Sequence, residues 1–151
     1  MKIDGALAAV AAFHRQCGSP VADAPTPLEG DAEAARELAM TLGVLADQTM
    51  KSGLAGDMLL LRTGLALEEL AEWLLAHADG DLPAAADAWA DRAYVILGDA
   101  VAAGLPASSL FAAVHASNAT KSPSPGGGGK AVKGPGYVPP EIAGALRPSA
   151  G

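Results

Sequence analysis

Cysteine and aromatic residues are both scarce in this sequence of 151 residues, and each scarcity excludes a class of protein. Cys17 is the single cysteine, so the chain can form no internal disulfide and offers no zinc-site spacing. Aromatic residues make up only 4% of the chain, whereas a β-sandwich is rich in Val, Ile and Tyr. Ala, Leu and Gly dominate instead, which favours helices packed closely through small side chains. The composition therefore predicts an all-α protein.

Basic residues and long hydrophobic runs are also few. The formal net charge is −7, and the 10 basic residues do not form one helical stripe, which argues against a nucleic-acid polymer as partner. No stretch reaches the roughly 18 uncharged residues needed to cross a bilayer, so we expect no membrane partner and a cytoplasmic location. The apolar run over residues 5–13 precedes His14 and Arg15 rather than small cleavage-site residues, so we interpret it as a first helix.

Helix-forming stretches and the residues that break them predict five helices. Asp31 is suited to cap the second helix, Gly104 to end the fourth, and Pro106 to open the fifth. The predicted bounds are residues 3–16, 31–51, 57–78, 83–103 and 106–120. From Ser122 onward Pro, Gly, Lys and Ser prevail, so we predict no regular structure there. We expect a helical domain over residues 1–121 and a Gly/Pro/Lys-rich tail over residues 122–151.

Three carboxylates interrupt an apolar face of the third predicted helix. At about 100° per residue, Glu68, Glu69 and Glu72 share one arc with several large apolar residues. The opposite side of the helix is also rich in leucine, which is typical of a helix packed on several sides. Acidic residues in such a helix need a counter-charge.

The fourth predicted helix repeats this pattern, because Asp87 and Asp91 fall on a small apolar stripe at i, i+3 and i+4 spacing. Five carboxylates can therefore converge across one helix pair. Oxygen ligands without Cys or a paired His suit Mg²⁺ or Mn²⁺ shared with substrate phosphates. One alternative is that these acids form ordinary solvated helix faces. Another is a di-iron bundle, but neither Glu69 nor Glu72 has the His three residues later that such sites use.

Several motifs in the chain resemble one protein family. The segment LRTGLALEELAEWLLAHADGDLPAAADAWADRAYVILGDAVAAGL contains a paired-Glu motif, EELAE, and an acidic motif, DAWAD, on the next helix. VHASNATK is similar to a third element ending in Asn and Lys, and GKAVKGPGYVPPEI and FHRQCGSPV are similar to the tail and first helix of one subgroup. Together they resemble the MazG-like branch of the all-α nucleotide pyrophosphohydrolases, which includes phosphoribosyl-ATP pyrophosphohydrolases and dimeric dUTPases. Residues 30–56 lie outside the resemblance and are interpreted as an insertion.

The resemblance implies a set of metal ligands, carried over position by position: Glu68, Glu69, Glu72 and Asp91. Most members have a Glu three residues before the second-helix Asp, but Ala88 stands there in this chain. Asp87, four residues before Asp91, shares its face and is our candidate substitute. Because the Asp side chain is shorter, the sequence leaves open whether one or two metal ions bind.

The resemblance also implies substrate contacts by Asn118 and Lys121, which are three residues apart on one helix face. Lys130 and Lys133 are predicted to close over the phosphates, with solvated charges as the alternative, and Tyr137 to stack on the base. For Trp73 and Trp89 we predict a place in the core or a subunit interface. Arg62 is expected to pair with Glu69 or a neighbouring acid rather than with phosphate.

The implied activity is hydrolysis of a nucleoside triphosphate, dUTP being one option, to the monophosphate and pyrophosphate in a house-cleaning or nucleotide-pool role. Mg²⁺ would neutralise charge and lower the pKa of the attacking water. Glu69 is a candidate base rather than a metal ligand, and the sequence does not separate the two roles. The family further implies a homodimer or a dimer-of-dimers tetramer. Two alternatives stay open: a non-catalytic helical interaction module of the same fold, and a phosphoribosyl-ATP pyrophosphohydrolase.

Overall fold

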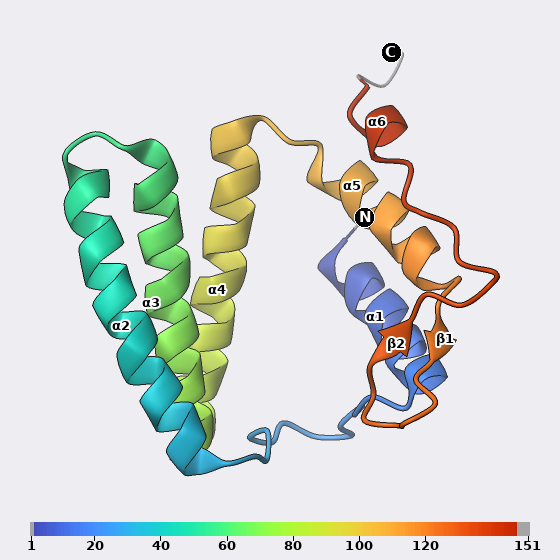
Figure 1. Ribbon diagram of the computed structural model, residues 1–151, viewed down its shortest axis with the longest axis horizontal. Helices are drawn as coiled ribbons and strands as arrows, with labels where there is room; N and C mark the ends of the chain where they lie inside the picture. The colour runs from blue at the N-terminus through green and yellow to red at the C-terminus, as the bar shows by residue number, and fades with distance from the viewer. Residues whose placement is uncertain (1, 148–151) are drawn as a thin grey trace. The chain divides into compact units, whose positions relative to one another are not determined.

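The computed structural model describes residues 2–147, and most of them are helical (Figure 1). The elements are α1 (Ile3–Cys17), α2 (Ala32–Leu54), α3 (Met58–Ala78), α4 (Leu82–Ala103), α5 (Ala107–Asn118), β1 (Ser122–Pro123), β2 (Ala131–Val132) and α6 (Ile142–Ala145). The predicted all-α fold and its five helices are confirmed. No single helix within residues 2–147 combines the length and hydropathy needed to span a bilayer.

Side-chain caps and one glycine define the helix ends at the positions expected from the sequence. The Asp31 carboxylate accepts hydrogen bonds from the backbone N–H groups of the first turn of α2. Asp57 caps α3 in the same way. Gly18 follows α1 with φ 71°, a left-handed conformation that glycine adopts without strain. These local signals explain why the helix bounds could be read from the sequence.

The contacts divide the chain into two compact units, one made of residues 24–103 and the other of residues 1–23 with 104–151. We call them the long-helix unit and the terminal unit. In the long-helix unit, α3 packs against both α2 and α4, and the three helices form one layer (Figure 1). The boundaries of these two units differ from the predicted boundary at residue 121. The division into a catalytic domain and a tail stays a prediction.

Small residues allow the helices of the long-helix unit to approach closely. A Cβ atom added at Gly53 would lie 2.5 Å from the Leu61 Cα, and one at Gly64 would lie 2.7 Å from the Met50 side chain. The buried apolar residues of this unit are Ala39, Ala46, Ala71, Ala76, Ala85, Ala88 and Val95. Close packing of α2 on α3 therefore depends on glycine and alanine at the contact.

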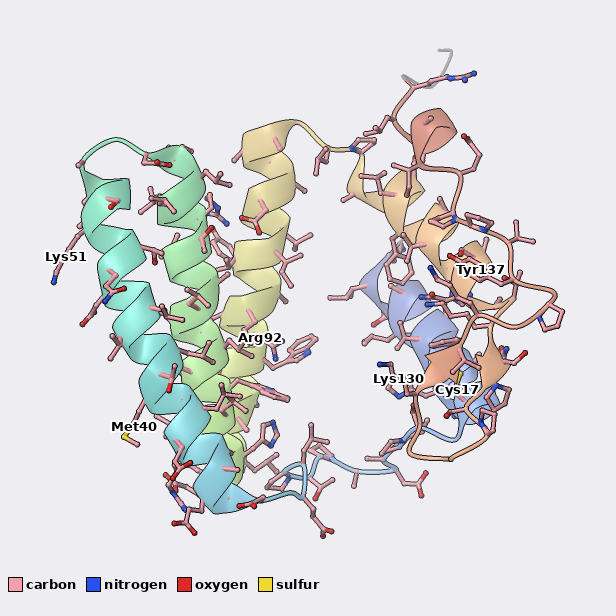
Figure 2. All side chains as sticks on the ribbon, viewed as in Figure 1. Cys17, Met40, Lys51, Arg92, Lys130 and Tyr137 are labelled. Atoms are coloured by element: carbon pink, nitrogen blue, oxygen red, sulfur yellow. The ribbon has the colours of Figure 1, made fainter. Side chains whose placement is uncertain are left out.

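A single layer of helices leaves many large apolar side chains uncovered. Met40 on α2 is 65% exposed, Tyr94 on α4 is 80% exposed, and Figure 2 shows Met40 pointing away from α3. Within residues 2–147 no large side chain is fully buried. The long-helix unit thus has apolar faces that a further layer of protein would cover.

The terminal unit joins the two ends of the chain through side chain to backbone hydrogen bonds. Gln16 on α1 donates to the carbonyl oxygens of Ala119 and Lys121, at 3.2 and 2.8 Å. Ser117 on α5 donates to the Val138 carbonyl oxygen at 2.7 Å. The prediction that the tail has no regular structure is wrong in part, because β1 and β2 pair antiparallel and α6 packs on α5. Residues 148–151 of the predicted tail lie outside the described residues.

Candidate functional site

Glu69 has the most unusual environment among the five predicted metal ligands. Its side chain is half-buried, and its Oε2 atom is buried without a hydrogen-bond partner among residues 2–147. Burial raises the pKa of the Glu69 carboxyl above its ordinary value, and the negative charges of Glu72 and Asp91 raise it further. A buried carboxylate oxygen without a hydrogen-bond partner destabilises the fold, and binding of a proton or a cation would remove this cost.

The electrostatic coupling shows which carboxylates the fold brings together. After burial, the groups that raise the pKa of Glu69 are Glu72, Asp91, Glu68 and Asp87, in that order. Two of these acids come from α4, so Glu69 interacts with carboxylates on both helices, as the sequence predicted. The five side chains are not arranged as a finished ligand shell, however. Within residues 2–147 no group of three or more His, Cys, Asp or Glu side chains has the geometry to hold a metal ion.

The other four carboxylates of this cluster are exposed: Glu68, Glu72, Asp87 and Asp91. Glu68 and Glu72 line a groove of about 250 Å³ between α2 and α3. Asp47 of α2 lines the same groove, and sequence reasoning missed it because α2 was interpreted as an insertion. The signal that would have found it is its place after Ala39 and Gly43, on the face of α2 that contacts α3.

Arg62 forms the predicted ion pair with an acid, and that acid is Asp99 on α4, not Glu69. Its Nε lies 2.6 Å from a carboxylate oxygen of Asp99 on α4, and its guanidinium also donates to the Val95 carbonyl oxygen. Gly98 makes room for this arrangement, because a Cβ atom there would lie 2.6 Å from the Arg62 Nη2. Arg62 therefore ties α3 to α4, and Glu69 keeps no basic partner among the described residues.

The predicted substrate-binding residues lie in the terminal unit. Lys133 Nζ lies 4.9 Å from the centre of the Tyr137 ring. A hydrogen bond with Ser117 lowers the pKa of the Tyr137 hydroxyl, and the Lys133 and Lys121 ammonium charges lower it further. The fold thus brings Lys121, Lys133 and Tyr137 together.

Two more predicted substrate contacts belong to the same unit. Asn118 is the last residue of α5 and is half-buried, and its carbonyl oxygen accepts from the Lys121 backbone N–H at 3.0 Å. Lys130 is exposed in the loop between β1 and β2, and its carbonyl oxygen accepts from the Ser124 N–H at 3.1 Å. Figure 2 labels Lys130 and Tyr137 in this unit. The roles of all five residues toward a substrate stay predictions.

The family model for phosphoribosyl-ATP pyrophosphohydrolase matches residues 35–118 of the chain. The matched range contains α3 and α4 with all five acidic residues of the cluster, all of α5 and most of α2. Comparison with curated proteins and with solved structures gives no significant match. The resemblance drawn from the sequence motifs is confirmed.

The interpretation of residues 30–56 as an insertion is wrong. The family match begins at residue 35 and so includes nearly all of α2. In the structure α2 is the principal packing partner of α3, the helix that presents three of the five carboxylates. The helix belongs to the shared fold, and it was missed because its own sequence contains none of the acidic motifs on which the resemblance depended.

Proposed function

Because the chain belongs to the phosphoribosyl-ATP pyrophosphohydrolase family, we propose that it hydrolyses nucleotides between the α- and β-phosphates with the help of Mg²⁺. Enzymes of this family act on phosphoric anhydride bonds, and the chain is a pyrophosphohydrolase of that kind. The products would be a nucleoside monophosphate and pyrophosphate. The finer points proposed below are the metal, the substrate and the assembly.

The observation that supports a metal ion most directly is the unpartnered Oε2 atom of Glu69. Four more carboxylates raise the pKa of this group through their negative charges, and no basic side chain among residues 2–147 pairs with it. A hard divalent cation would satisfy the buried oxygen and offset the repulsion, and an all-oxygen donor set suits Mg²⁺ or Mn²⁺. The chemistry of the donors therefore fits the ion, although the described residues do not form a complete shell.

We assign the ion to the acidic cluster of α3 and α4: Glu68, Glu69, Glu72, Asp87 and Asp91. Bound there, it would supply positive charge to offset the negative charge of the phosphates. Ala88 occupies the position where most members of the family have a Glu, and Asp87 is our candidate substitute for that Glu. Because the Asp side chain is shorter than Glu, binding of a second ion depends on Asp87. Waters or substrate oxygens would complete a coordination sphere that four exposed carboxylates leave open.

Glu69 is the residue best suited to accept a proton in the reaction. In the metal-free chain, burial and the surrounding negative charges raise its pKa, so its carboxylate is more basic than an ordinary one. Its other carboxylate oxygen, Oε1, would take the proton from water while the water oxygen bonds to phosphorus and the anhydride bond breaks. Pyrophosphate would then leave with the electron pair of that bond.

We propose that residues of the terminal unit contact the substrate: Asn118, Lys121, Lys130, Lys133 and Tyr137. Lys121 and Lys133 bring two positive charges close to the Tyr137 hydroxyl, a combination that suits phosphate oxygens. The tail from residue 122 would then cover the active site. Our first candidate for the substrate is a nucleoside triphosphate, as the sequence motifs imply. We propose a cytoplasmic location for the protein.

The exposed apolar faces of the long-helix unit support an oligomer. Met40, Tyr94 and Val101 are each at least 65% exposed. Large apolar side chains gathered on an exposed face are typical of a surface that another protein covers. A second copy that covers these faces would complete the core, and we propose a homodimer or a tetramer made of two dimers. Size-exclusion chromatography with light scattering measures the assembly directly.

The function is tested by assaying the full chain with Mg²⁺ and a panel of nucleoside triphosphates, and by identifying the products. We expect pyrophosphate and a monophosphate, and no turnover when EDTA removes the metal. Release of orthophosphate and a diphosphate would contradict the proposed bond. Absence of any turnover, with the chain folded, would favour the non-catalytic interaction module.

A second candidate substrate is phosphoribosyl-ATP, which the matching family model favours by its description. It presents the same triphosphate, so the acidic cluster would act on it in the same way. Turnover of phosphoribosyl-ATP without turnover of any nucleoside triphosphate would assign the chain to this reaction. Turnover of nucleoside triphosphates alone would assign it to the first.

A further inference from the structure

The long-helix unit contains a cavity of about 730 Å³ between the segment 26–32 and the C-terminal half of α3. Trp73, Leu74 and His77 of α3 form one wall, and Leu28 with the start of α2 forms the other. Its volume is within the range of small-molecule sites, and it combines apolar walls with a few polar groups. None of the predicted site residues lines it.

His77 is fixed in one tautomer on the wall of this cavity. Its Nδ1 accepts a hydrogen bond from the Leu28 backbone N–H at 2.8 Å. An accepting Nδ1 requires that the proton of the neutral ring is on Nε2. Within residues 2–147 Nε2 has no hydrogen-bond partner, so it remains a donor for a ligand.

Trp73 is held in place by two neighbours. The Arg92 guanidinium lies 4.6 Å from the centre of the Trp73 ring, and the His77 ring makes an edge contact with the same ring at 4.6 Å. Figure 2 labels Arg92 on α4. Because both contacts restrict the indole ring, little conformational entropy is lost when a ligand binds against it.

The charges on the cavity wall indicate what it accepts. Three acidic residues line it: Glu29, Asp31 and Asp79. Asp79 pairs with Arg36 at 2.7 Å and Asp31 caps α2, so Glu29 is the acid on this wall without a partner among residues 2–147. A phosphate group would be repelled there, whereas a neutral ring would not. The Glu29 carboxylate accepts hydrogen bonds and the His77 Nε2–H donates one, which together match the edge of a base that has both an amino group and a ring acceptor.

We propose that this cavity binds the base of the nucleotide, and that it prefers a base with an exocyclic amino group over uracil. The inference depends on the proposed function for the identity of the ligand. Trp73 follows Glu69 by one helical turn, about 6 Å along the axis, so one nucleotide can span the acidic cluster and the cavity.

The first experiment uses Trp73 as its own reporter. The chain has two tryptophans, so a Trp89→Phe variant leaves Trp73 as the single one, with the cavity unchanged. We titrate this variant with AMP, CMP and UMP in EDTA, and with inorganic triphosphate as a probe without a base. Saturable quenching by AMP and CMP, weak quenching by UMP and none by triphosphate supports the proposal. No quenching by any monophosphate overturns it, and equal quenching by UMP overturns the amino preference.

The second experiment compares matched tryptophan variants in the hydrolysis assay. Trp73→Leu removes the aromatic surface, and Trp89→Leu makes the same change at a residue that is 47% exposed and does not line the cavity. From the free energy of stacking a base on an aromatic side chain, we expect KM to rise by about tenfold or more in Trp73→Leu. We expect kcat to change less, and Trp89→Leu to match the wild type. Equal KM values in the two variants overturn the proposal, as does a larger rise in Tyr137→Leu.

The two experiments separate failure of the cavity from failure of the enzymatic proposal. Turnover with no quenching and no KM effect removes the base site and leaves the pyrophosphohydrolase proposal standing. Quenching by AMP in a chain that hydrolyses no nucleotide keeps the base site and removes the proposed reaction. Circular dichroism of each variant shows that the fold is retained before either result is used.

Discussion

The long-helix unit and the terminal unit differ most in charge. Residues 24–103 contain 14 acidic and 4 basic side chains, a net charge of −10. Residues 1–23 and 104–151 contain 3 acidic and 6 basic side chains, a net charge of +3. The overall charge of −7 hides this asymmetry. The carboxylates suited to a cation and the lysines suited to phosphate therefore belong to different units.

The two units also position their candidate residues by different physical means. On α3 and α4 the helical repeat alone sets which carboxylates share a face. In the terminal unit the candidate lysines lie in segments without helical structure. Their positions depend on hydrogen bonds between distant residues, such as that from Gln16 to the Lys121 carbonyl oxygen. The comparison teaches that the acidic side of the proposed site is encoded locally, whereas the basic side requires distant segments to meet.

The largest effect is expected from neutralising the acidic cluster. Glu69→Gln and Asp91→Asn should each lower kcat by about a hundredfold or more, because a proton acceptor or a metal ligand is lost. Steady-state assays with Mg²⁺ measure the change, and thermal unfolding shows that the variants remain folded. Asp23→Asn, an acid of the terminal unit, is the control. Wild-type activity in Glu69→Gln would remove this residue from the site.

The packing of the long-helix unit is tested by two glycines of α2. Gly53→Ala should destabilise the fold, because the added Cβ would lie 2.5 Å from the Leu61 backbone. At Gly43 a Cβ atom would meet nothing within 4 Å, so Gly43→Ala should stabilise the helix by about 0.5–1 kcal/mol. We expect the free energies of unfolding of the two variants, measured with urea, to differ by about 1–3 kcal/mol. Equal values would contradict the close approach of α2 to α3.

The lysines of the terminal unit should affect binding more than chemistry. Lys133→Ala and Lys121→Ala should raise KM by about tenfold each, since a charge-assisted hydrogen bond to phosphate is worth about 1.5–3 kcal/mol. Their kcat values should fall much less than that of Glu69→Gln. Lys2→Ala, also a basic residue of the terminal unit, provides a matched control. A fall in kcat with KM unchanged would place these lysines in the chemical step instead.

The smallest effect concerns stability in the absence of metal. The pKa of Glu69 is raised in the folded chain, so its ionisation above the ordinary value of 4.5 destabilises the fold. Stability from this group is present below that value and is lost as the pH rises through the raised pKa. In EDTA at neutral pH, Glu69→Gln should therefore raise Tm slightly, and the difference should vanish below pH 4.5. Mg²⁺ should raise Tm in the wild type more than in Glu69→Gln.

Much of the fold and part of the candidate site follow from the sequence alone. Asp31, Asp57 and Gly18 mark helix ends through local backbone chemistry, and those ends are confirmed. The spacing of Glu69 and Asp91 predicted that carboxylates of two helices would influence each other, and the raised pKa of Glu69 agrees. The caps depend on neighbours within one helical turn, and the positions of the acids depend on the repeat within each helix; the approach of Asp91 to Glu69 itself is a tertiary contact between α3 and α4.

Only the tertiary structure decided which partners lie far apart in sequence. It paired Arg62 with Asp99 instead of Glu69, made α2 the packing partner of α3, and formed the cavity of Trp73 and His77 around a loop. It also ordered part of the tail through a hydrogen bond from the Ser19 hydroxyl to the Gly129 carbonyl oxygen, 110 positions away. The reason is physical: helical periodicity fixes the direction of a side chain on its own helix, but not the surface that the helix meets. That choice is made by the packing of the whole chain.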